Sequence, residues 1–259
     1  MSPLALAMDA LDAELEQWRS AGRTPRALLR DDDAVADTPA LRRLFAICER
    51  HGAPLLLAAI PGPAEPGLGA AVRAFPLATG AVHGFAHVSH SAIGEKPCEL
   101  NRRRPASVLL REMREGREKL GDLFGGEISG LLVPPWNRIH GEVVPLVAQA
   151  GFSGISAHGW EQYPRSTSLA GVHAHVDVVH WSAGARGRDP AWAITQTYEA
   201  LGEARARGFR AIGLLAHHLA HDETAWSTLD ELIGALSQRG VSFVPADSLI
   251  AGAVADDQA

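Results

Sequence analysis

The amino-acid sequence predicts an α/β protein built on a parallel β-sheet. Short apolar runs of strand length alternate with helix-length segments along most of the chain. That alternation implies parallel strands joined by right-handed crossovers, in an open or a closed sheet. The length of 259 residues fits one large domain or two small ones. Because no linker, repeat or low-complexity tract divides the chain, we predict a single domain over residues 1–259.

The first predicted elements are a helix, a strand and a second helix. Apolar residues three or four positions apart form one stripe of an amphipathic helix at the start of the chain: Leu4, Met8, Leu11, Leu15 and Trp18. A strand, RALLRDDDA, follows over residues 26–34. The next helix has Thr38 as its N-cap, Pro39 at its first helical position and Gly52 at its end.

The rest of the chain repeats this pattern. The further apolar runs, which we predict as strands, are 54–61, 80–87, 128–136, 152–158, 172–181, 209–218 and 241–246. The further helix-length segments are 105–123, 139–150, 189–207 and 222–238, the last with Asp222 as N-cap. The Pro/Gly-rich stretch 61–69 is too short to separate two domains.

Composition narrows the classes of function. The net charge is −6 and no basic block occurs, which argues against a broad nucleic-acid surface. The sequence contains no run of about eighteen apolar residues, the length that could span a bilayer. The two cysteines form no CxxC pair and the N-terminus lacks the features of a secretory signal, so we expect a cytoplasmic protein without disulfides. Dinucleotide-binding, phosphate-loop and serine-hydrolase motifs are all missing from the sequence.

Polar side chains gather at the ends of the predicted strands. In barrels and open α/β sheets the functional face lies at the carboxyl ends of the strands, so we expect these residues to meet at one rim. They are Asp31, Asp32 and Asp33, then His83 and His87, the run 134–138, Asp177 and His180, and finally His217, His218 and His221.

The stretch VHGFAHVSH, residues 82–90, holds three histidines: His83, His87 and His90. Histidine is the commonest metal ligand and titrates nearest neutral pH, so the run indicates a metal site, an acid–base pair or a surface cluster. Two imidazoles with one carboxylate would form a triad that leaves coordination positions open, which favours a catalytic metal. A wholly structural set of histidines is the alternative.

Four motifs, taken in order, resemble those of the polysaccharide deacetylase family, metal-dependent carbohydrate esterases that include chitin and peptidoglycan deacetylases. RDDDA, HGFAH, VPPW and LAH stand where the family has an Asp-Asp pair, an HxxxH pair, an RPP-aromatic loop and a Leu-x-His. The resemblance spans residues 28–222. It implies a single distorted (β/α) barrel of seven or eight mostly parallel strands with surrounding helices.

Carried over residue by residue, the resemblance implies a role for each motif residue. Asp33, His83 and His87 would hold one divalent metal ion. Asp32 would be the general base, although the triple aspartate also allows Asp31 as base with Asp32 as ligand. The Trp136 amide would hold the oxyanion and His217 would be the general acid. Supporting or substrate-binding roles are expected of Arg30, Asp31, His90, Asn137, Arg138, Asp177 and His218.

The resemblance has one marked departure, because Val133 stands where the family has an arginine. Arg30 or Arg138 could supply the missing positive charge. The implied activity is metal-dependent hydrolysis of a non-peptide carbon–nitrogen bond, releasing an acyl group, expected to be acetyl, from an N-acetylated sugar or a related small amide. Zinc is the first expected metal, with cobalt, nickel or manganese as alternatives.

Two further expectations concern ligands. With six Trp, two Tyr and seven Phe, the chain offers a modest stacking platform, which favours a short carbohydrate or another small molecule over a long polymer. The alternative function is a non-catalytic metal- or carbohydrate-binding barrel that has lost deacetylase activity.

Overall fold

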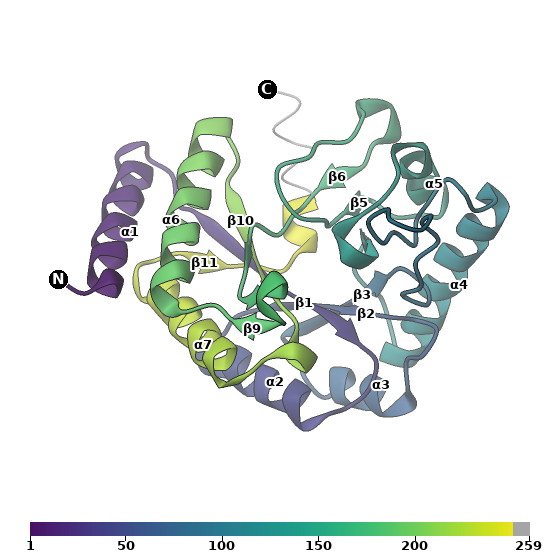
Figure 1. Ribbon diagram of the computed structural model, residues 1–259, viewed down its shortest axis with the longest axis horizontal. Coiled ribbons are helices and arrows are strands. Elements are labelled where there is room, and N and C mark those ends of the chain that lie inside the picture. Colours follow the sequence, from purple (N-terminus) through teal and green to yellow (C-terminus); the bar gives the residue numbers. More distant parts are fainter. Residues whose placement is uncertain (251–259) are drawn as a thin grey trace. The chain divides into compact units, whose positions relative to one another are not determined.

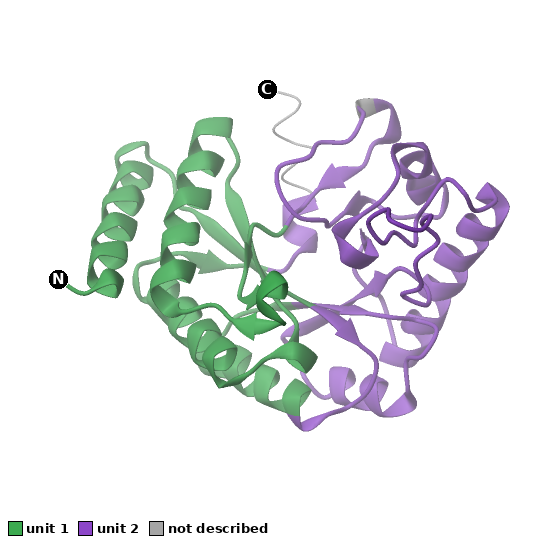
Figure 2. Cartoon of the chain, viewed as in Figure 1, with its two compact units in different colours: residues 1–31, 40–55, 174–244 green, residues 32–39, 56–173, 245–259 purple. Residues whose placement is uncertain are grey.

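The computed structural model describes residues 1–250 as two compact units. Unit 1 consists of residues 1–31, 40–55 and 174–244, and unit 2 of 32–39, 56–173 and the segment that begins at Pro245 (Figure 2). The boundary passes through strand β1 (Arg26–Ala34), between Asp31 and Asp32. The single domain over residues 1–259 stays a prediction.

The strands form one curled, mostly parallel sheet, which confirms the predicted fold class (Figure 1). Its hydrogen-bonded order is β6-β5-β4-β3-β2-β1-β10-β7, and β11 also pairs with β1. After β1 the strands of this sheet are β2 (Leu55–Ala59), β3 (Ala78–His83), β4 (Leu131–Val133), β5 (Gly154–Ile155), β6 (Ala170–Gly171), β7 (Val176–Asp177), β10 (Ala211–Ala216) and β11 (Ser242–Phe243). A separate antiparallel pair consists of β8 (Val179–His180) and β9 (Arg186–Gly187).

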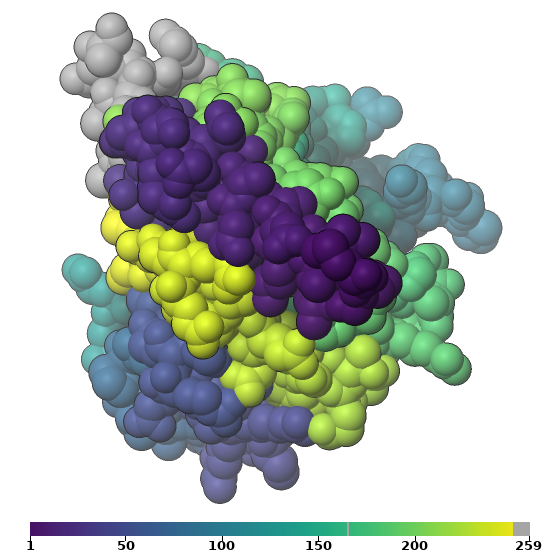
Figure 3. Space-filling model, turned by 90° about the vertical axis from the view of Figure 1, so that its left-hand side faces the viewer, coloured from purple at the N-terminus to yellow at the C-terminus, as the bar shows by residue number. Residues whose placement is uncertain are grey.

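Three of the four helices of unit 1 begin after a residue whose side chain caps them, Ser2, Asp189 or Asp222. They are α1 (Pro3–Ser20), α2 (Pro39–His51), α6 (Pro190–Arg207) and α7 (Glu223–Gln238), with Pro39 itself in unit 2. The predicted N-cap Asp222 is confirmed, because its carboxylate accepts the Ala225 N–H at 2.9 Å. Helix α1 packs against α6 (Figure 3). Leu11, Leu15 and Trp18 of its predicted stripe are buried.

Unit 2 contains α3 (Pro66–Arg73), α4 (Ala106–Phe124) and α5 (Val144–Gln149). Helix α3 packs on α4, and both contact β3. Helix α4 ends at Gly125, whose φ of 76° is the left-handed conformation in which glycine costs least. Within residues 1–250, no helix combines the length and the apolar character that a membrane crossing requires.

Two segments differ from the sequence prediction. The Pro/Gly-rich stretch 61–69 includes the start of α3, with Pro66 at its first position, where proline is well tolerated. The run 172–181 is not one strand, because it contains β7, which pairs with β10, and β8, which pairs with β9, with Val178 between them. There the Asp177 carboxylate accepts the Val179 N–H at 2.9 Å, a local side-chain bond that competes with the ladder.

Candidate active site

The centre of the candidate site is a triad of Asp33, His83 and His87 in unit 2. Their ligand atoms all lie within 4.8 Å of one another. Asp33 Oδ1 lies 3.1 Å from His83 Nε2 and 3.2 Å from His87 Nε2. Asp33 lies near the end of β1, His83 is the last residue of β3, and His87 belongs to the loop that follows. The structure therefore brings together the three metal ligands that the sequence predicts.

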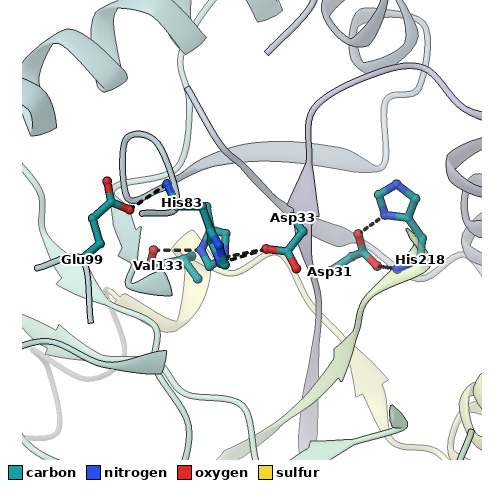
Figure 4. Close-up of polar contacts among 7 residues, drawn as sticks. Asp31, Asp33, His83, Glu99, Val133 and His218 are labelled. Atoms are coloured by element: carbon teal, nitrogen blue, oxygen red, sulfur yellow. Dashed lines mark hydrogen bonds and ion pairs between the residues drawn. The ribbon is translucent and has the colours of Figure 1, made fainter. Parts of the chain in front are cut away.

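The donor set of the triad fits a cation. His83 Nδ1 lies 3.0 Å from the Val133 carbonyl oxygen, which can only accept, so Nδ1 carries the proton (Figure 4). In the neutral ring, Nε2 then presents its lone pair to the Asp33 carboxylate. Two acceptors at this separation repel each other unless a positive charge lies between them. Val133 thus supports the site through its backbone, whatever its side chain.

Burial keeps His87 in the state that a metal ligand needs. It lowers the pKa of His87 below its ordinary value, and the nearby Asp33 carboxylate opposes this shift only in part. The imidazole is therefore neutral near pH 7, with a lone pair available for a metal ion.

Backbone strain is concentrated at this site. Among the residues in the described part of the chain, six other than glycine have a positive φ. Four of them belong to the candidate site: Asp33 (71°), His87 (55°), Trp136 (54°) and Asn137 (56°). Such conformations cost of order 1–3 kcal/mol each and persist where the surrounding structure enforces them, often at functional sites.

Glu99 is a supporting residue that the sequence analysis missed. Its side chain is buried, and Oε1 accepts the N–H groups of Phe85 and Ala86 while Oε2 accepts that of His87, all at 2.9–3.0 Å. These bonds fold the loop that carries His87. Gly84 permits the close approach, because a Cβ there would lie 2.3 Å from Glu99 Oε2. No sequence signal marks Glu99, since its partners are backbone amides.

Trp136 lies beside the triad in unit 2, where its ring contacts His87 and its backbone adopts a left-handed conformation. The indole packs against His87 with ring centroids 4.3 Å apart. The left-handed turn at Trp136 and Asn137 follows Pro134 and Pro135, whose fixed φ angles stiffen the approach. Within this turn the N–H groups of Asn137 and Arg138 donate to the carbonyls of Pro134 and Pro135 at 2.9 and 3.1 Å.

His90 and Arg138 lie in loops of unit 2 and do not belong to the triad. The His90 N–H donates to the Cys98 carbonyl at 3.0 Å, and Arg138 Nη1 donates to the Pro97 carbonyl at 3.2 Å. Arg138 therefore fastens the loop over residues 88–98. Asp32, which precedes Asp33 of the triad, is buried.

The remaining predicted residues lie in unit 1, where the Asp177 carboxylate lies beside the His217 imidazole. Asp177 Oδ1 lies 3.7 Å from His217 Nδ1, and Oδ2 accepts the Trp181 indole N–H at 2.9 Å. Burial by itself would raise the pKa of Asp177, but its contact with His217 and the N–H donors hold it below the ordinary value. The Trp181 ring meets the His217 imidazole edge to face at 4.7 Å.

Asp31 and Arg30 are both fully buried on β1. The Asp31 carboxylate is engaged with His218, accepting its backbone N–H at 2.8 Å and contacting Nδ1 at 2.5 Å (Figure 4). Asp31 is not a member of the triad, which contains Asp33. These contacts favour the register in which Asp32, and not Asp31, is available as a base.

Comparison with known proteins bears on the fold. Neither models of protein families nor curated protein sequences match this chain. Among solved structures, a candidate polysaccharide deacetylase from Mycobacterium smegmatis matches with a TM-score of 0.67 and 17% identity, over 90% of this chain and 92% of that chain. The chain has the polysaccharide deacetylase fold. The predicted resemblance to that family is thus confirmed at the level of structure.

Two further structures with the polysaccharide deacetylase fold show its range. A family 4 carbohydrate esterase from Streptomyces lividans, in complex with acetate, matches with a TM-score of 0.55 and 14% identity, over 84% of this chain and 91% of that chain. A CE4 family pseudoenzyme from Bacillus anthracis matches with a TM-score of 0.56 and 11% identity, over 85% of this chain and 63% of that chain. The fold therefore accommodates both an esterase and a pseudoenzyme.

Proposed function

We propose that this protein is a metal-dependent hydrolase that removes an acyl group, with acetyl as the first choice, from an N-acetylated sugar or a related small amide. The observation that carries the proposal is the triad of Asp33, His83 and His87, held by strained backbone in the polysaccharide deacetylase fold. Two imidazoles and one carboxylate favour zinc, with cobalt, nickel or manganese as alternatives.

The proposed chemistry divides among four groups. A divalent cation held by the triad would act as a Lewis acid on the acyl carbonyl and increase the acidity of the attacking water. Asp32 accepts the proton of that water as general base. The Trp136 N–H donates to the developing oxyanion, and His217 protonates the departing amine. Asp177 orients the His217 ring. Buried Arg30 is the candidate to supply the positive charge of the family's arginine, which Val133 replaces in this chain.

The first experiment measures metal content together with activity. Protein purified without chelators should contain about one divalent ion per chain, by elemental analysis, and should release acetate from short N-acetylated sugars or amides. Asp33→Ala should lose both the ion and the activity, because it removes a ligand. Wild-type protein that neither carries nor takes up a stoichiometric divalent ion would exclude the proposal.

The second experiment separates the base from the ligand. Asp32→Asn should abolish turnover while the metal content stays at the wild-type level, because the amide cannot accept the proton of water at neutral pH. Asp122→Asn, at an exposed carboxylate on α4 in the same unit, is the matched control and should keep full activity. Unchanged turnover in Asp32→Asn would assign the base elsewhere.

A second candidate function is a non-catalytic metal- or carbohydrate-binding protein. Two observations favour it: Val133 replaces an arginine of the family motif, and a pseudoenzyme shares the fold. A binding protein needs the triad but not the general acid. Two results together would support this second function: the wild-type protein shows no turnover, and His217→Ala binds the ligand with the wild-type affinity.

A further inference from the structure

We propose that Asp31 and His218 form a clamp that positions His217 for its role as general acid. The proposal rests on the proposed function, since it concerns the acid of the same reaction. Asp31 and His218 would touch neither substrate nor metal. They would act through the backbone of His217, which makes them positioning residues.

The clamp is a buried two-point contact within unit 1. Asp31 accepts from the backbone N–H of His218 with Oδ2 at 2.8 Å and contacts Nδ1 of the same residue with Oδ1 at 2.5 Å. Both side chains are fully shielded from solvent. A single carboxylate thus fixes the main chain and the ring of one residue together, which leaves His218 very little rotational freedom.

The peptide groups around His217 are held on both sides of that residue. The His217 N–H donates to His221 Nε2 at 3.3 Å, and the His217 carbonyl accepts the Ala220 N–H at 2.8 Å. Asp31 holds the next N–H along the chain, that of His218. With its backbone fixed at these three points, the His217 ring can rest in one orientation against Asp177.

The clamp also connects two strand ends. Strands β1 and β10 pair in parallel, and Asp31 is in register with Ala216, the residue before His217. Asp31 directly precedes Asp32, the proposed base, in the sequence. The clamp therefore connects the end of β10, which His217 follows, to β1. On β1 the next two residues after Asp31 are the proposed base, Asp32, and the proposed metal ligand, Asp33.

A packing role alone does not account for this pair. Two positions earlier in the same register, β1 and β10 carry the buried apolar pair Leu29 and Leu214. A buried carboxylate–imidazole pair is often no more stabilising than apolar residues of similar volume, because removing polar groups from water is costly. The pair instead fixes the orientation of the His218 backbone N–H, which directly follows the proposed acid His217.

The test compares two substrates that differ in their leaving group. Di-N-acetylchitobiose releases an amine, which must be protonated as it departs, whereas p-nitrophenyl acetate releases a phenolate that needs no acid. His217→Ala should lower kcat about 10²–10⁴-fold on the amide and only a few-fold on the ester. Asp31→Asn and His218→Gln should follow the same selectivity, with a loss on the amide of about 10²-fold and with unchanged metal content.

The matched control is an Asp–His pair of unit 1 away from His217, in which His51 Nε2 lies 2.7 Å from Asp230 Oδ1. Asp230→Asn should change kcat on neither substrate. Equal losses on the amide and the ester in Asp31→Asn and His218→Gln would indicate a general structural defect and overturn the clamp. Wild-type rates on both substrates in both variants would overturn it as well.

Amide hydrogen exchange distinguishes failure of the clamp from failure of the proposed function. In Asp31→Asn, exchange should accelerate at residues 217–221 and stay unchanged over α4. If the wild-type protein hydrolyses neither substrate, the proposed function fails, and accelerated exchange would still support the clamp as a restraint on this segment. Unchanged exchange at residues 217–221 would overturn the clamp, whatever the activity.

Discussion

At the candidate site, the position of a single residue depends on side chains that hydrogen-bond to its backbone and to that of its neighbours. Glu99 is the clearest case, because one buried carboxylate accepts three consecutive N–H groups of the loop that ends at His87. Charge-assisted bonds of this kind are about twice as strong as neutral ones. They help to hold His87 at its φ of 55°.

Replacing Glu99 should weaken metal binding without removing a ligand. In Glu99→Gln the side-chain amide presents N–H donors where the loop also presents donors, so the turn at His87 should loosen. We expect zinc affinity to fall about 10–100-fold, as for other residues that support metal ligands. Titration calorimetry with zinc measures this change. Glu118→Gln, at an exposed position on α4, is the control, and equal affinities of the two variants would refute the role of Glu99.

His221 should make stability dependent on pH. Burial lowers its pKa from 6.5 to about 4 in the folded protein. Between these values the unfolded chain binds the proton first, so this contribution to stability is complete above pH 6.5 and is lost as the pH falls toward 4. The contribution amounts to about 3 kcal/mol at most.

Urea denaturation across this pH range tests the contribution of His221. The free energy of unfolding of the wild-type protein should decrease from pH 6.5 to pH 4, and His221→Gln should show a smaller decrease, since glutamine does not titrate. Parallel pH dependences for the two proteins would show that other groups are responsible.

At the scale of elements, close helix packing in unit 2 depends on a single glycine. Helices α3 and α4 are in contact, and Gly69 of α3 faces the backbone of α4. A Cβ at residue 69 would lie 2.3 Å from the Leu123 carbonyl oxygen. At Gly67, in the same helix, a Cβ would meet only Asp37 at an ordinary 3.7 Å.

These two glycines provide a matched pair of substitutions. Gly69→Ala should lower the free energy of unfolding by about 1–3 kcal/mol, because the added methyl group forces α3 and α4 apart. Gly67→Ala should be neutral or stabilising by up to about 1 kcal/mol, since alanine favours the helix. Chemical denaturation of both variants measures the difference, and a Gly69→Ala protein as stable as Gly67→Ala would contradict the packing.

The elements that could be predicted from the sequence are those with a strong periodic pattern and local caps. Helices α2 and α7 begin at or next to Pro39 and Asp222, as predicted. The run 172–181 could not be predicted correctly from its alternation. There a hydrogen bond of the Asp177 side chain decides where pairing ends, and periodicity carries no information about such a bond.

For the whole molecule, metal binding should increase stability, because the folded chain brings the three ligands together and the unfolded chain does not. At a metal concentration one hundred times the dissociation constant, this linkage contributes about 2.7 kcal/mol. Zinc should therefore raise the Tm of the metal-free wild-type protein and leave that of Asp33→Ala unchanged. Equal shifts for both proteins in a thermal unfolding experiment would show that zinc binds elsewhere.

The sequence by itself determined the α/β class, the order of most strands and helices, and the set of polar residues that follow the strands. These features are encoded locally, in hydrophobic periodicity, capping residues and the spacing of the histidines. Only the tertiary structure decided which side chains Asp31 and Asp33 contact. Strand alternation would send Asp31 and Asp33 to the same face, but Asp33 leaves regular strand geometry at a φ of 71°. Asp31 instead binds His218, whereas Asp33 faces His83 and His87, and these partners are set by pairing between distant strands.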